Sequence, residues 1–157
     1  MRIVVACLTA TMLCACGTRY QDMGFSGGVE AQRITADTYR IVARGNAYTA
    51  STAIQDYALL KAAETTKEAG GSHFLIISAA DSTKVEVGQT PSTLQTNVYG
   101  RTAVSTYSPG ATYTMIKPGQ DAYIRVLRLT PGQPAPSGAF FADEIIQHVG
   151  SRVKKPT

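Results

Sequence analysis

The sequence has no cysteine after residue 16, and only two histidines. All three cysteines, Cys7, Cys14 and Cys16, lie at the start of the chain. Beyond them the chain can form no disulfide, no thiolate nucleophile and no cysteine metal site. His73 and His148 carry no spacing typical of a metal ligand or a catalytic base. We therefore expect both histidines to be structural or exposed, and we expect no metal and no cofactor.

The excess of positive over negative charge is also small. Lys and Arg total 15 and Asp and Glu total 11 in 157 residues. The basic residues are scattered, apart from Arg152, Lys154 and Lys155 near the end of the chain, which we interpret as a solvated tail. Nucleic-acid binding usually needs a basic stripe or an aromatic platform. The composition therefore argues against a nucleic-acid partner.

The first residues are typical of a secretory signal. Arg2 precedes an apolar run over residues 3–13, which is too short to span a membrane. Leu13, Cys14, Ala15 and Cys16 then match the bacterial lipobox, in which a small residue precedes the cysteine that takes a diacylglycerol. We predict a signal peptide over residues 1–15 and lipid attachment, including palmitate, at Cys16. The alternatives are an ordinary signal peptide with incidental cysteines and a cytosolic N-terminus.

A lipid on Cys16 would anchor the chain stably, because diacylglycerol plus an amide-linked acyl chain exceeds the two signals that stable anchoring needs. Gly17 follows the cysteine, where aspartate would favour retention in the inner membrane. The expected location is therefore the outer membrane, facing the periplasm or the surface. Residues 16–28 are polar and rich in glycine, and we predict that they form a flexible tether, the stretch Gly24–Gly28 included.

The clearest structural signal is a helix followed by a strand over residues 45–80. Thr52 and Gln55 fit a capping box, and Gly70 with Gly71 would end the helix. The predicted buried stripe is mostly alanine and contains Ala58, Leu59, Ala62, Ala63, Thr66 and Ala69. The apolar run over residues 74–78 predicts a strand that is covered on both faces and packs against this helix.

The turn before this helix contains Asn46 and Thr49. A helix N-terminus has free backbone amides that favour anions, so these residues could belong to a binding site. The interpretation we favour is that they shape the turn and help to cap the helix.

The remaining elements predict a single α+β domain over residues 29–153, with one small sheet packed by the alanine-rich helix and by a second, C-terminal helix. Besides the strand over 73–79, we expect strands over 29–34, 38–44 and 123–129, an irregular connection over 130–138 and the last helix over 140–149. In that helix Asp143 and Glu144 would favour the positive end of the helix dipole.

A segment rich in Thr, Ser, Gly and Pro covers residues 88–119, and residues 81–87 before it could extend the sheet. Proline and glycine at 109 and 110 suit a type II turn, which would pair residues 98–107 with 111–116. A long mobile loop is the alternative. The tyrosines of this segment, Tyr99, Tyr107 and Tyr113, are candidates for recognition.

Several of these stretches together resemble a known family. They are Gly27-Gly28 before a strand, the Gly45-Asn46-x-x-Thr49 turn, the run from Tyr57 to Glu64 and the strand from Phe74 to Ile77. The chain is similar there to the uncharacterised proteobacterial lipoproteins called the CC0125/CC1285 family. The resemblance covers residues 20–78 and, more weakly, the helix at 143–150. It implies an envelope lipoprotein of unknown role and brings no catalytic residues.

Three functional hypotheses follow. The first is a lipid-anchored envelope protein without enzymatic activity, which acts as a structural or protein-interaction module of the outer membrane and has an envelope protein as its partner. The second is a signalling lipoprotein that reports envelope stress to a sensor. The third is a hydrolase built on His73 with Asp or Ser partners, and the sequence offers it the least support.

Overall fold

The fold is seen in a computed structural model, which describes residues 17–130 and 132–153. The chain divides into two compact units, one made of residues 85–116 and the other of the sequence on both sides of them. We call the second unit the core unit and residues 85–116 the ribbon. The core unit has the predicted α+β fold, a sheet with two helices.

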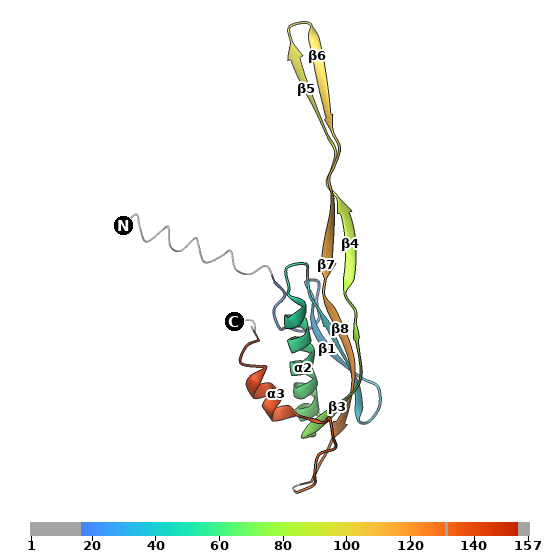
Figure 1. Ribbon diagram of the computed structural model, residues 1–157, viewed down its shortest axis with the longest axis vertical. Helices are drawn as coiled ribbons and strands as arrows, with labels where there is room; N and C mark the ends of the chain where they lie inside the picture. The colour runs from blue at the N-terminus through green and yellow to red at the C-terminus, as the bar shows by residue number, and fades with distance from the viewer. Residues whose placement is uncertain (1–16, 131, 154–157) are drawn as a thin grey trace, which may run out of the picture. The chain divides into compact units, whose positions relative to one another are not determined.

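The sheet of the core unit has five antiparallel strands (Figure 1). Their order is β1 (Gly28–Arg33), β2 (Thr38–Arg44), β8 (Gly119–Leu127), β3 (His73–Asp81) and β9 (Phe140–Phe141). The middle strand of the sheet is β8, which follows the ribbon in the sequence. Because β8 pairs with both β2 and β3, it joins the two strands that precede and follow helix α2 (Ser51–Glu68) in the sequence.

Two helices pack on the sheet, α2 (Ser51–Glu68) and α3 (Ala142–His148), and Figure 1 shows them on the same side of it. The side chains between the layers form one cluster that includes Ile41, Leu60, Phe74 and Ile124, each with no exposed surface. Apolar residues of β2, β8 and both helices therefore share one core.

Helix α2 begins and ends close to the predicted residues, but its first turn differs. The N-cap residue is Ala50, and no side chain caps the helix, so the predicted capping box of Thr52 and Gln55 is wrong. The helix has already begun at Ser51, which places Thr52 inside the first turn. At the other end Ala69 is the C-cap and Gly70 adopts a φ of 73°, as expected for a glycine that stops a helix.

The buried face of α2 is wider than the predicted alanine stripe. Ala58, Ala62, Ala63 and Thr66 are buried as predicted, whereas Leu59 and Ala69 are half-buried. The structure also buries Ile54, Tyr57, Leu60 and Thr65. The reason is that α2 packs against α3 and the N-terminal segment as well as against the sheet.

Strand β3 is not covered on both faces, which corrects the prediction for residues 74–78. Phe74 is fully buried, but the side chain of Ile77 is 52% exposed. The helices lie on one face of an antiparallel sheet, and such a sheet commonly leaves its other face to solvent. The continuous apolar run therefore marks a half-covered strand.

The described part of the predicted tether packs against the core unit. Thr18 and Tyr20 are buried, and the Tyr57 hydroxyl donates to the Thr18 carbonyl at 2.9 Å. The Tyr20 hydroxyl donates to Glu64 of α2, and its ring meets that of Tyr57 edge to face. Residues 18–28 are thus held by hydrogen bonds and aromatic contacts, which corrects the prediction that they are free.

The other predicted elements are confirmed with shifted ends. The predicted strand over 38–44 has the bounds of β2, and those over 29–34 and 123–129 correspond to β1 and β8. Residues 132–139 lie outside helices and strands, as expected from their prolines. The last helix is shorter than predicted, because residues 140 and 141 pair with β3 as strand β9.

The ribbon contains two short antiparallel pairs. Strands β4 (Lys84–Gln89) and β7 (Thr112–Lys117) form one pair, and β5 (Thr93–Tyr99) and β6 (Thr102–Ser108) form the other. Residues 84–87 therefore pair with β7 rather than extend the five-stranded sheet. The hairpin that joins β5 to β6 turns at Gly100, whose φ is 62°.

The predicted type II turn at residues 109 and 110 is wrong. That turn needs a positive φ at its glycine, and Gly110 is not among the glycines with positive φ. Instead, residues 90 and 111 bond across the ribbon, with the Thr90 amide donating to the Ala111 carbonyl at 2.9 Å. A Cβ on Gly110 would lie 1.8 Å from the Thr90 carbonyl oxygen, so this close approach is the reason for glycine there.

Candidate functional site

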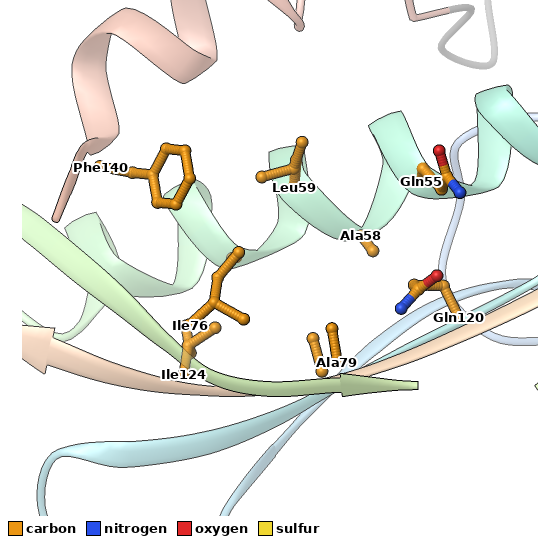
Figure 2. Close-up of a pocket in the computed structure, with 10 residues that line it drawn as sticks. Gln55, Ala58, Leu59, Ile76, Ala79, Gln120, Ile124 and Phe140 are labelled. Carbon is orange, nitrogen blue, oxygen red and sulfur yellow. The ribbon is translucent and has the colours of Figure 1, made fainter. Parts of the chain in front are cut away.

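An apolar groove of about 300 Å³ lies between α2 and the sheet (Figure 2). Helix α2 contributes Gln55, Ala58, Leu59 and Ala62, and the strands contribute Ile76, Ala79, Gln120, Ala122, Ile124 and Phe140. Figure 2 shows the amides of Gln55 and Gln120 at one end of the groove and the ring of Phe140 at the other. The volume is at the lower end of the range for small-molecule pockets.

The lining of this groove limits its chemistry. Its two polar side chains are the amides of Gln55 and Gln120, and none of its ten residues titrates. Such a lining can contact an apolar group and donate or accept hydrogen bonds at one end, but it offers no acid, base or nucleophile for catalysis.

Small side chains on both layers produce the groove. Ala58 and Ala62 of α2 and Ala79 and Ala122 of the strands line it, and Figure 2 shows Ala58 across from Ala79. Methyl groups at these positions leave open the space that larger side chains would fill. The sequence prediction treated the alanine face as a filled core and missed the groove. Alanines at 79 and 122 were the available signal, but only the strand order shows that they lie across from the helix.

Asn46 and Thr49 form a hydrogen-bonded turn that also holds the N-terminal segment. The Asn46 side-chain oxygen accepts from the Tyr48 amide at 3.0 Å and from the Thr49 hydroxyl at 2.9 Å. Thr18 then bridges the two, since its hydroxyl accepts from the Asn46 amide and its amide donates to the Thr49 hydroxyl. These contacts support the prediction that both residues shape the turn, whereas the predicted help in capping is wrong, because no side chain caps α2.

The two histidines occupy separate places in the core unit. The His73 ring stacks on Phe141 with centroids 4.9 Å apart, and its Nδ1 lies 2.9 Å from the Ser72 hydroxyl. His148 is exposed at the end of α3. Within residues 17–130 and 132–153, no three His, Cys, Asp or Glu side chains are close enough together to hold a metal ion.

Asp121 of β8 binds two arginines of β2. Its carboxylate lies 2.6 Å from Arg44 and 2.9 Å from Arg40. Partial burial acts to raise the pKa of Asp121, but the hydrogen bonds and charges of the two arginines outweigh it and hold that pKa below its usual value. The cluster joins adjacent strands by charge and is a structural feature of the sheet.

The segment Gly24–Gly28 fits the letters of a G-x-S-x-G motif, which the sequence interpretation of a tether passed over. A nucleophile elbow needs a strand before the serine and a helix after it. Here the amides of Gly24 and Gly27 bond to each other's carbonyls in a tight turn, and strand β1 follows. The segment is therefore a turn, and it lacks the strained geometry that exposes a catalytic serine.

The ribbon presents a second candidate surface. Its side chains are exposed almost throughout, and they include Leu94, Val98, Tyr99 and Tyr107, each at least 63% exposed. Within residues 85–116 the charged residues are Glu86 and Arg101, and the end residues of β4 and β7, Lys84 and Lys117, lie just outside this range. Exposed apolar residues on a nearly uncharged surface are typical of interaction sites.

Comparisons with family models, curated proteins and solved structures find no match for this chain. The predicted lipid site, Cys16, lies outside the described residues. Within the described ranges, none of the helices has the length and apolar character needed to cross a bilayer.

Proposed function

We propose that this chain is a lipid-anchored protein of the outer membrane that acts as a protein-interaction module through its ribbon. The observation that carries the proposal is the exposure of apolar and tyrosine side chains along the ribbon, with two charged residues among its 32 positions. Exposed apolar surfaces of this kind commonly mark sites that bind another molecule. The proposal assigns no enzymatic activity to the chain.

The lipobox at residues 13–16 supports the anchor, and the resemblance to the CC0125/CC1285 lipoproteins is part of the same proposal. Residue 17 lies beside the turn at Tyr48 and Thr49, which places the start of the described chain at the N-terminal end of α2. A lipid on Cys16 would therefore hold the domain close to the membrane, because the residues after it are packed on the core unit.

Metabolic labelling tests the anchor. Labelled palmitate is expected to enter the wild-type protein and to be absent from Cys16→Ser, whereas Cys14→Ser keeps the proposed attachment site and should still be labelled. Equal labelling of wild type and Cys16→Ser would contradict the anchor.

Site-specific photocrosslinking in intact cells tests the interaction surface. A photoreactive phenylalanine replaces Tyr99 of the ribbon in one variant and Tyr48 of the core unit in another, and the two tyrosines are similarly exposed, at 70% and 78%. Specific crosslinked products are expected from position 99 and not from position 48. The same products from both positions would contradict a role for the ribbon.

A further inference from the structure

Strand β5 has an open edge. In the described parts of the chain it is hydrogen-bonded to β6, so the backbone N–H and C=O groups of its outer edge lack a partner strand. A two-stranded hairpin is marginally stable in water, and three or more strands with an apolar face are needed for independent stability. Natural edge strands are usually protected by lysine, proline or a bulge, and β5 contains none of these. It is therefore suited to pair with another strand.

The side chains of β5 are arranged symmetrically about Thr96. The strand reads Thr-Leu-Gln-Thr-Asn-Val-Tyr, with an amide on each side of the central threonine and an apolar residue beyond each amide. In an antiparallel pair of two such strands, Leu94 lies opposite Val98, Gln95 opposite Asn97, and Thr96 opposite itself. The Thr–Thr pair is a favourable cross-strand pair, and the other two pairs place an apolar residue opposite an apolar one and an amide opposite an amide.

We propose that two copies of this chain pair through β5, with a two-fold axis at Thr96, to form a four-stranded antiparallel sheet. This inference rests on the proposed role of the ribbon as an interaction surface and names its partner. An isologous pair of this kind is the commonest symmetry of homo-oligomers. It also raises the strand number from two to four, as an independently stable sheet requires.

Charge and face pattern agree with a second copy as the partner. Strands β5 and β6 contain no charged residue, so two copies do not repel each other along the shared edge. In the register of the hairpin, Leu94 pairs with Tyr107 and Val98 with Ala103, which places the four on one face. When two copies pair through β5, this face of one copy continues into the same face of the other. A single ribbon buried in lipid would instead leave both its edges without hydrogen bonds, which disfavours the membrane as the partner.

Single-cysteine variants of the full-length lipidated protein test the pairing in intact cells. Thr96→Cys is expected to give a disulfide-linked dimer under mild oxidation, because the Cβ atoms of directly opposed residues lie about 5 Å apart. The matched control is Ser105→Cys, since Ser105 is the cross-strand partner of Thr96 and is equally exposed. Two copies of Ser105 would be separated by three strand spacings, about 14 Å, and should not crosslink.

Each other outcome overturns the proposal. Equal crosslinking of both variants would indicate random collision, and crosslinking of Ser105→Cys alone would place the interface at β6. If neither variant crosslinks, including with a short bifunctional maleimide, the ribbon does not pair with itself through β5. The protein without an added cysteine gives the background.

A charge at the same two positions provides a second measurement. Thr96→Lys would place two like charges opposite each other at the axis, so the dimer of the detergent-purified protein should be lost. Ser105→Lys, which removes the same Thr96–Ser105 hydrogen bond, should leave the dimer intact. A dimer unchanged in Thr96→Lys contradicts the pairing.

The two proposals fail in distinguishable ways. If position 99 captures another protein and Thr96→Cys gives no dimer, the ribbon is an interaction surface but not for a second copy. If Thr96→Cys gives the dimer while Cys16→Ser keeps its palmitate label, the pairing stands and the anchor is wrong.

Discussion

The core unit and the ribbon are built from the same kinds of apolar side chain, yet the two bury them to opposite extents. Val29 of the core unit is 2% exposed, whereas Val98 of the ribbon is 70% exposed. Both lie in antiparallel strands. The difference is that α2 and α3 cover the sheet of the core unit and no helix of the described residues is part of the ribbon. Residue type alone therefore does not decide burial here; the covering layer does.

A matched pair of leucine substitutions tests this contrast with the largest expected effect. Leu60 of α2 has no exposed surface, and Leu94 of β5 is 68% exposed. Leu60→Ala should lower the free energy of unfolding of the core unit by about 2–5 kcal/mol, because it removes buried methyl groups and leaves a cavity. Leu94→Ala should change it by less than about 0.5 kcal/mol, since that side chain is not part of this core.

Chemical denaturation followed by far-UV circular dichroism measures both variants, at a protein concentration held constant because the ribbon is proposed to self-associate. Leu59→Ala, at a half-buried position on the groove, is the intermediate case. A loss of similar size for Leu94→Ala and Leu60→Ala would mean that the ribbon folds as part of the same core.

Two glycines sharpen the comparison with a smaller effect. A Cβ on Gly71 would lie 2.4 Å from Val126 of β8, and a Cβ on Gly110 would lie 1.8 Å from the Thr90 carbonyl oxygen of the ribbon. Gly71→Ala should lower the free energy of unfolding of the core unit by about 1–3 kcal/mol through overpacking. Gly110→Ala should disturb the ribbon alone.

Amide hydrogen exchange separates the two effects residue by residue. In Gly110→Ala, faster exchange is expected within residues 85–116, with the amides of β2 and β8 unchanged. Gly132→Ala is a control for added bulk, since nothing lies within 4 Å of its Cβ position, although its φ of 87° adds some strain. Faster exchange throughout the chain in Gly110→Ala would contradict the independence of the ribbon.

The sequence predicted the elements of the core unit better than their arrangement. The spacing of apolar residues and the glycines that end an element are local signals, so the bounds of β2 and the end of α2 at Gly70 could be predicted from them directly. The burial of β3 did not follow, because the four apolar residues from Phe74 to Ile77 look the same in sequence whether one face of the sheet or both are covered. Whether the second face is covered depends on where the helices pack, and because both lie on one side of the sheet, Ile77 is exposed.

The two candidate surfaces were harder to predict. The groove depends on alanines from positions 58, 62, 79 and 122, which only the tertiary fold brings together. In the ribbon, Pro109 and Gly110 are residue types typical of a turn, but they lie across from another proline-containing stretch, around Pro91. A local turn preference does not show whether the chain reverses direction at these residues or continues from one strand pair to the next. Which of the two occurs depends on the strand that pairs with them.

Acidification offers the smallest and most specific test of the comparison. The ion cluster of Asp121, Arg40 and Arg44 belongs to the core unit, and the pKa of Asp121 is lowered in the folded state. A carboxyl whose folded pKa is depressed stabilises the fold above its unfolded pKa of about 3.9, and that contribution is lost as the pH falls through the folded pKa. We expect Asp121 to contribute about 1 kcal/mol near neutral pH, since the arginines are partly exposed.

Asp121→Asn should therefore be less stable than wild type at pH 7, and its stability should fall less than that of wild type below about pH 4. Asp143→Asn, which breaks an exposed pair with Lys67, should change both quantities little. If the free energy of unfolding depends on pH in the same way for Asp121→Asn and wild type, the ion cluster does not stabilise the core unit.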